Sequence, residues 1–133
     1  RNEILVFGRA CRAQVELLQL IESWGHATRF APTVADAISG FGVERLPALV
    51  IHETDDNLAG ALDTLDALDH AAGRPLPALL IHPGPAPATE LRQPRRRLLA
   101  RPYRPARLRA LIDYLLGPGE EGDEAGNDGN GDA

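Results

Sequence analysis

Leu46-Pro47-Ala48-Leu49-Val50-Ile51-His52-Glu53 is the stretch of sequence that decides the fold of this chain. Residues 49–51 form a continuous apolar run, which is typical of a strand buried on both faces of a parallel sheet. The run is followed by His52 and the acidic Glu53. The stretch therefore predicts a buried strand over residues 49–52 with a carboxylate at its carboxyl end.

Comparable apolar runs alternate with helical spacings along the rest of the chain. We expect further strands over residues 3–7, 26–31, 77–81 and 97–100, and helices over residues 11–24, 34–41, 58–72 and 105–116. Gly25 and Gly117 are placed to end two of these helices, and Thr33 is a suitable N-cap for another. Strands that alternate with helices pair in parallel through right-handed crossovers. The sequence thus predicts a three-layer α/β fold with a doubly wound, five-stranded parallel sheet.

The helix signal is poor between the fourth and fifth expected strands. Residues 89–93 could form only about one turn before Pro94, whose ring and missing N–H break a helix interior. We therefore predict that the fourth helix is short or missing.

Charge is distributed unevenly between one expected domain, residues 1–117, and a tail, residues 118–133. The tail holds six acidic side chains and no basic one, so it contributes −6 to the net charge of −5 and leaves residues 1–117 at +1. A segment rich in Gly, Asn, Asp and Glu cannot bury enough surface to order itself. We expect one folded domain followed by a disordered acidic tail, because 133 residues are too few for two ordinary cores.

The cysteine and methionine content bears on location. The single cysteine, Cys11, excludes an intramolecular disulfide and favours a reducing, cytoplasmic setting. No run approaches the roughly 20 consecutive apolar residues of a membrane span, so we expect no membrane contact by this chain. Because the sequence starts at Arg1 and contains no methionine, we expect it to be a piece of a longer polypeptide, which could itself be attached to a membrane.

Three enzymatic interpretations are weak. A dinucleotide site would need a second glycine at a fixed spacing after Gly8, and a serine hydrolase would need a G-x-S-x-G turn, whereas Ser23 and Ser39 fall in expected helices. A transition-metal site is conceivable, but adjacent strand residues point to opposite faces of a sheet. Its candidate ligands are His52, Glu53, Asp55, Asp56 and His82. We expect this chain to have no enzymatic activity.

Three local segments resemble the receiver domain of response regulators. They are residues 22–26 (ESWGH), 73–81 (GRPLPALLI) and 101–109 (RPYRPARLR), and the resemblance covers residues 3–117. The segments look like those of receivers at the C-terminal end of hybrid sensor histidine kinases. The resemblance implies a flavodoxin-like fold and a role in bacterial two-component signal transduction or a phosphorelay.

The resemblance also shows where the phosphoryl-transfer site of receivers is altered. Receivers bind Mg²⁺ with an acidic pair after the first strand, where this chain has Gly8 and Arg9, so Mg²⁺ binding is expected to be lost. Glu53 stands at the position of the acceptor aspartate, His82 at that of a Ser or Thr, and Arg101 at that of a lysine. The resemblance further implies a cis peptide bond before Pro102.

Glu53 allows two interpretations. Its carboxylate is either a built-in mimic of the phosphorylated state or a group neutralised by Arg9 or Arg101, and we favour neutralisation because glutamate brings one charge and a phosphoryl group nearly two. The favoured function is a phosphorylation-independent pseudo-receiver that acts by protein contact. The alternative is an atypical receiver that still accepts phosphate on Glu53 or Asp55.

Two surfaces are candidates for partner contact. The first helix, through Cys11, Arg12, Val15 and Gln19, corresponds to the surface with which receivers dock on the histidine-bearing helical bundle of a kinase. The second follows the fifth strand and last helix, where receivers form homodimers, and comprises residues 83–96 with Leu98, Leu99, Tyr103, Arg104, Arg107 and Tyr114. Arginines cluster in the last third of the chain, and three interpretations of them are open: an ordinary solvated face, a surface that contacts the acidic tail, or a binding site for an acidic protein. Nucleic acid is not expected as a partner, because Tyr103 is the only nearby stacking aromatic.

Overall fold

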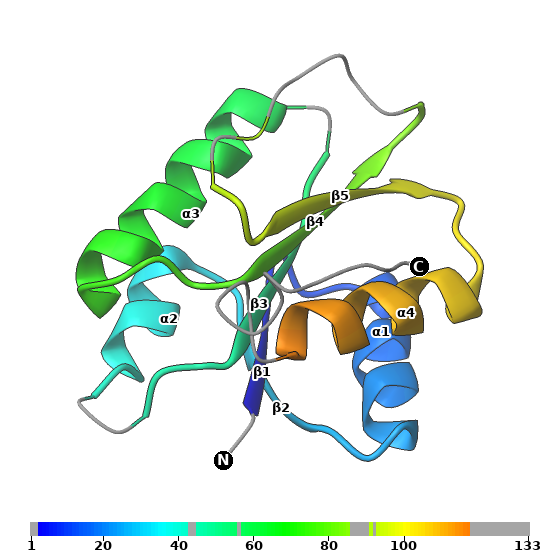
Figure 1. The fold of residues 1–133 in the computed structure, drawn as a ribbon, viewed down its shortest axis with the longest axis horizontal. Coiled ribbons are helices and arrows are strands. Elements are labelled where there is room, and N and C mark those ends of the chain that lie inside the picture. The colour runs from blue at the N-terminus through cyan, green and yellow to red at the C-terminus, as the bar shows by residue number, and fades with distance from the viewer. Residues whose placement is uncertain (1–2, 43–44, 56, 86–90, 92, 118–133) are drawn as a thin grey trace, which may run out of the picture.

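The computed structural model of the chain describes residues 3–42, 45–55, 57–85, 91 and 93–117. It has five parallel strands in the order β2-β1-β3-β4-β5. The strands are β1 (Glu3–Phe7), β2 (Ala27–Ala31), β3 (Leu49–Glu53), β4 (Ala78–Pro83) and β5 (Arg96–Arg101). The helices are α1 (Arg12–Ser23), α2 (Val34–Ser39), α3 (Leu58–Ala72) and α4 (Pro105–Leu116). Figure 1 shows α2 and α3 on one face of the sheet and α1 and α4 on the other, which confirms the predicted three-layer fold.

The helix ends follow the signals in the sequence. Thr33 caps α2, since its side chain accepts a hydrogen bond from the backbone N–H of Asp36 at 3.1 Å. Gly73 ends α3 with a left-handed φ of 78°, which a glycine adopts without steric cost. Pro105 lies in the first turn of α4, where its missing N–H is not needed.

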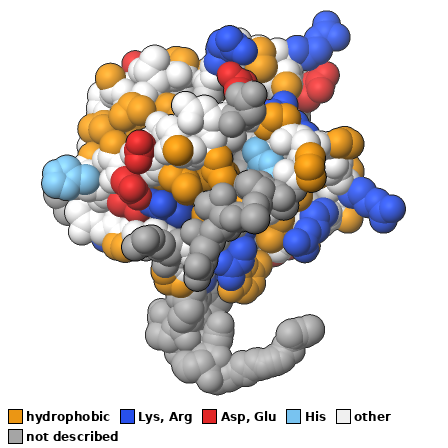
Figure 2. Space-filling view, turned by 90° about the horizontal axis from the view of Figure 1, so that it is seen from above, with side chains coloured by type: hydrophobic (Ala, Val, Ile, Leu, Met, Phe, Trp, Pro, Cys, Tyr) orange, Lys and Arg blue, Asp and Glu red, His pale blue; other side chains and the backbone are white. Residues whose placement is uncertain are grey.

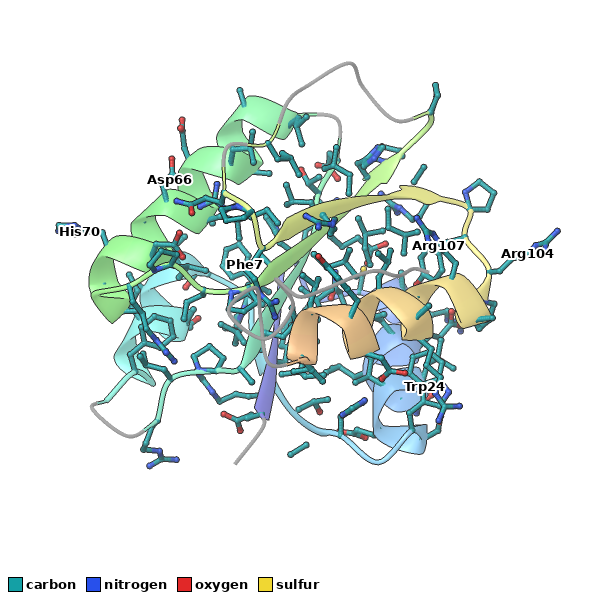
Figure 3. All side chains as sticks on the ribbon, viewed as in Figure 1. Phe7, Trp24, Asp66, His70, Arg104 and Arg107 are labelled. Carbon is teal, nitrogen blue, oxygen red and sulfur yellow. The ribbon has the colours of Figure 1, made fainter. Side chains whose placement is uncertain are left out.

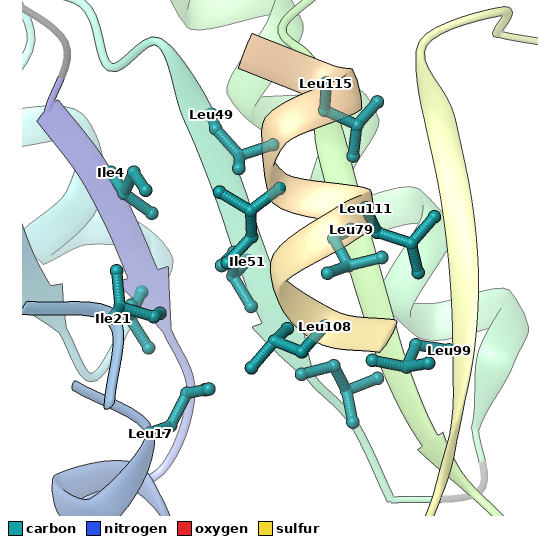
Figure 4. Close-up of a cluster of buried hydrophobic side chains, with 13 residues drawn as sticks. Ile4, Leu17, Ile21, Leu49, Ile51, Leu79, Leu99, Leu108, Leu111 and Leu115 are labelled. Atoms are coloured by element: carbon teal, nitrogen blue, oxygen red, sulfur yellow. The ribbon is translucent and has the colours of Figure 1, made fainter. Parts of the chain in front are cut away.

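Two apolar layers hold the sheet, one on each face. Alternate residues of β1 divide between them: Ile4 and Val6 pack toward α1 and α4, and Leu5 and Phe7 pack toward α2 and α3. Figure 4 shows the first layer, in which leucines of α4 lie over β3, β4 and β5. The central strands are therefore apolar on both faces, as the run over residues 49–51 predicted.

The inward face of α1 includes a polar residue that the sequence analysis did not single out. Gln14 is 3% exposed, whereas the apolar Val15 is 52% exposed, on the surface expected to contact a partner. Leu17 and Ile21 fix the buried stripe of the helix, and Gln14 lies three residues before Leu17 on that same stripe. Val15 is turned about 100° away from it.

The segment between β4 and β5 contains no helix in the residues that are described there. These are residues 84, 85, 91 and 93–95, and the other residues expected to form a weak fourth helix lie outside the described part of the chain. The tail, residues 118–133, also lies outside it, so its expected disorder stays a prediction. Among the described residues no helix is long and apolar enough to cross a membrane.

Arg96 is a second departure from the sequence interpretation, which placed it on a solvated basic face. It is 5% exposed, and its Nη2 lies 2.7 Å from Asp66 Oδ1 and 2.9 Å from Asp69 Oδ2. The side chain of Asp69 also accepts a hydrogen bond from the backbone N–H of Leu76 at 2.8 Å. These contacts join the edge strand β5 to α3.

Replacing Asp69 should therefore destabilise the fold much more than replacing Asp66. Asp69→Ala leaves the buried Arg96 with one exposed partner and the Leu76 N–H with none, for an expected cost of about 3 kcal/mol. The Asp66 side chain is 63% exposed, so Asp66→Ala should cost less than about 1 kcal/mol. Urea unfolding of both variants measures the difference, and equal losses would contradict this assignment.

Candidate functional site at the carboxyl ends of the strands

Glu53, the last residue of β3, is the centre of the candidate site. Its side chain is 9% exposed, and both carboxylate oxygens have partners. Oε2 lies 3.0 Å from Nη1 of Arg101, and Oε1 accepts a hydrogen bond from Nε2 of Gln14 at 3.1 Å. The carboxylate is thus enclosed between a guanidinium group and an amide N–H.

Arg101 holds this arrangement from the end of β5. Its Nη2 donates to the backbone oxygen of Thr54 at 3.0 Å, so one guanidinium group contacts both the side chain of Glu53 and the residue after it. The peptide bond between Arg101 and Pro102 is cis, as the resemblance implied. Of the two arginines considered as partners of Glu53, the structure has Arg101 in this role; Arg9 is exposed and makes no ion pair within the described residues.

Gly8 provides the space that the Gln14 amide occupies. A Cβ atom added to residue 8 would lie 3.0 Å from Nε2 of Gln14, and the φ of Gly8 is +153°, which residues with side chains rarely adopt. The Gly8 backbone N–H donates to Ala31 at 3.1 Å, which holds the loop after β1 in place. Gly8 and Gln14 therefore fit each other sterically.

Burial raises the pKa of Glu53, and the charge of Arg101 opposes part of that rise. The same carboxylate helps to raise the pKa of Tyr103, after the larger effect of that residue's own burial. Tyr103 therefore experiences the charge at residue 53.

The two histidines are not part of this carboxylate site. His52 faces the other side of the sheet. Its Nδ1 lies 3.2 Å from the backbone oxygen of Phe7, and its ring packs edge-on against the Phe7 ring, with 4.7 Å between the ring centroids. Burial lowers the pKa of His52, which favours neutral imidazole. His82 is 5% exposed, and its Nδ1 lies 3.3 Å from the backbone oxygen of Pro83 rather than near the Glu53 carboxylate.

The possible transition-metal site is not assembled in the described part of the chain. No three His, Cys, Asp or Glu side chains gather there closely enough to hold a metal ion, and Asp56 lies outside that part. His52 and Glu53 are on opposite faces, as the alternation of strand side chains predicted.

The two predicted contact surfaces are largely exposed. On α1, Cys11, Arg12, Val15 and Gln19 all face solvent. Along β5 and α4, Leu98, Tyr103, Arg104 and Arg107 line a hollow of about 590 Å³, and Tyr114 is 46% exposed. Leu99 is 6% exposed and packs in the core layer beneath α4, and it also lines this hollow, so its role as a contact residue stays a prediction.

Gln14 is the residue of the site that sequence reasoning missed. The signal was its position three residues before Leu17 and seven before Ile21, which places it on the buried stripe of α1. A polar residue on such a stripe needs a buried partner, and the acidic end of β3 is the one that it meets.

The strand order and the helices that cover the sheet are those of the response regulator receiver fold. Solved structures with this fold include NtrX from Brucella abortus, with a TM-score of 0.70 and 21% identity over 86% of this chain and 26% of that one. A receiver domain protein from Clostridium thermocellum has a TM-score of 0.67 and 14% identity, with 87% and 94% of the two chains covered. The receiver domain of the hybrid histidine kinase CckA has a TM-score of 0.66 and 16% identity, with 87% and 100% covered.

These likenesses confirm the predicted receiver fold. The chain spans about a quarter of the length of NtrX and nearly all of the two receiver domains. No protein-family model matches the sequence, and no curated protein is significantly similar to it.

The raised pKa of Glu53 makes a prediction about stability and pH. For a carboxyl group whose pKa is higher in the folded than in the unfolded state, folding stability falls as pH rises through the folded pKa. The variant Glu53→Gln lacks this ionisation. As the pH rises from 4 to 7, across the usual glutamate pKa of about 4.3, its free energy of unfolding should therefore increase relative to that of the wild type. Urea unfolding at both pH values measures the change; a relative loss for the variant at pH 7 would show that the ion pair with Arg101 outweighs burial.

Proposed function

We propose that this chain is a phosphorylation-independent pseudo-receiver, a non-catalytic module that acts by protein contact in two-component signal transduction. The main support for this proposal is that both oxygens of the Glu53 carboxylate already have partners, Arg101 and Gln14. A phosphoryl acceptor needs a free oxygen to attack the phosphorus, and phosphoryl transfer depends largely on positioning and charge neutralisation. The contacts of Glu53 support a site that has lost this function.

The donor groups around Glu53 do not fit Mg²⁺. This ion prefers oxygen ligands in octahedral geometry, but Gly8 has no side chain and Gln14 turns its amide N–H toward the carboxylate. Arg101 adds a fixed positive charge 3.0 Å from Oε2. The proposed function therefore uses no metal and no phosphoryl intermediate.

The proposed context is a cytoplasmic part of a hybrid histidine kinase or a related bacterial protein. The match with the receiver domain of the hybrid kinase CckA covers 100% of that domain and 87% of this chain, which supports that context. The proposed partners are the helical bundle of a histidine kinase, through the exposed residues of α1, and a signalling protein or second copy, through β5 and α4. Nucleic acid is not a proposed partner.

A phosphodonor assay tests this function directly. The full chain is incubated with a small acyl phosphate and Mg²⁺, and its intact mass is measured. We expect the mass to stay unchanged, because the acceptor oxygens are bound and no metal neutralises the incoming charge. A covalent adduct of phosphoryl mass, on Glu53 or Asp55, would refute the proposal and favour the atypical receiver.

A matched set of variants controls for the state of the scaffold. Gly8→Asp, Arg9→Asp and Glu53→Asp together restore the carboxylates of an active receiver, but the new Cβ at residue 8 would lie 3.0 Å from Gln14 Nε2. We expect phosphorylation only when Gln14→Ala is added to these three changes. An adduct on the triple variant alone would show that Gln14 does not obstruct the site.

A further inference from the structure

Arginines extend along one side of the molecule, where α4 runs back beside β5. We call this the basic face and define it by Arg97, Arg104, Arg107 and Tyr114. Arg97 and Tyr114 mark one end of it, because Arg97 Nη2 donates to the Tyr114 hydroxyl at 2.9 Å. Figure 3 places Arg104 and Arg107 together at the start of α4, which is the other end.

The charges of the basic face are not neutralised within the described residues. The Arg97 guanidinium donates only to neutral oxygens, at 2.8 Å to Pro94, 3.0 Å to Arg96 and 2.9 Å to Tyr114, and it lies over the Tyr114 ring. Arg104 and Arg107 are exposed and have no carboxylate within ion-pair distance in the described part of the chain. By contrast, the buried Arg96 and the partly buried Arg101 both have carboxylate partners.

The described residues that line the hollow near Arg104 and Arg107 include no acid, and Asp113 is the exposed acid of α4, next to Tyr114. The hollow there is lined by apolar groups, among them Leu98, Pro102 and Ala106, and by Arg104 and Arg107. Figure 2 shows basic side chains separated by apolar ones on the side where Figure 3 places Arg104 and Arg107. The face therefore suits a segment that carries several negative charges.

The chain supplies such a segment directly after α4. Residues 118–133 carry Glu120, Glu121, Asp123, Glu124, Asp128 and Asp132, with no basic residue. The segment starts beside the basic face, because Arg95, two residues before Arg97, donates to the backbone oxygens of Leu115 and Gly117. The rest of the chain has a net charge of +1, that is, 14 arginines against 13 of the 19 acids.

The segment is long enough to reach both ends of the face. Ten residues of helix separate Arg104 from Tyr114, a rise of about 15 Å. A flexible chain of 16 residues has an end-to-end distance of about 20 to 24 Å. Attachment at Gly117 gives the carboxylates a local concentration on the order of millimolar, so that individually weak ion pairs become populated.

We propose that residues 118–133 bind the basic face of the same chain and screen it electrostatically. The contact consists of several exposed ion pairs, so it exchanges rapidly and weakens with salt. It does not involve the Glu53 site. One consequence, which rests on the proposed function, is that the tail competes with any acidic partner for β5 and α4.

Paramagnetic relaxation in the full chain tests this contact. A nitroxide is attached to Gly131→Cys in a background in which the exposed Cys11 is replaced by Ser. We expect selective broadening of the Arg97, Arg107 and Tyr114 amides at low salt. The broadening should fall by about half or more in roughly 1 M salt, where the screening length is about 3 Å.

Two changes separate a charge contact from mere proximity of the label. Replacing the six tail acids by Asn and Gln leaves the folded residues untouched and should remove the broadening to the same extent as salt. Arg97→Gln with Arg107→Gln should also reduce it, whereas Arg45→Gln, an exposed arginine between α2 and β3, should not. Broadening that is unchanged by neutral tail residues, or that is equal around Arg45 and Arg107, would overturn the proposal.

Discussion

A parallel sheet covered by helices on both faces constrains where polar groups can stand in this protein. Its central strands must be apolar on both sides, because an unpaired charge buried against a helix costs several kcal/mol. In β1, β3 and β4 the apolar residues divide cleanly between two core layers. In β3 and β4 the polar side chains are accordingly placed near the carboxyl ends, where His52, Glu53 and His82 stand. The candidate site follows from this constraint.

The site offsets part of the cost of burying the Glu53 carboxylate within the chain itself. Gln14 reaches it from α1 and Arg101 from β5, so three elements far apart in sequence are joined at one carboxylate. Gly8 belongs to the same arrangement, since a Cβ there would lie 3.0 Å from Nε2 of Gln14 and the φ of Gly8 is one that residues with side chains rarely adopt. An internal set of partners replaces what would otherwise be open coordination positions, and this supports a role in protein contact rather than phosphoryl transfer.

The sequence predicted the strands and most helix boundaries because each depends on local patterns. Continuous apolar runs marked β3 and β4, and Thr33 and Gly117 marked the start of α2 and the end of α4. The pairing of Glu53 with Arg101 was one of two options that the sequence left open. The inward turn of Gln14 was missed because its partner, Glu53, is 39 residues away in sequence and only the fold brings the two together. The burial of Arg96 was missed because its partners, Asp66 and Asp69, are about thirty residues away and only the fold brings them together.

The measurement that tests the central claim most directly is an NMR titration of the full chain with Mg²⁺ and beryllofluoride, a mimic of the phosphoryl group. The account predicts that the resonances of Gly8, Gln14, Glu53 and Arg101 do not move, because the partners of the carboxylate are already in place. Saturable shifts at these residues that spread to Tyr103 and α4 would show that the site opens, binds a metal and a phosphoryl group, and works as a switch. That result would contradict the account.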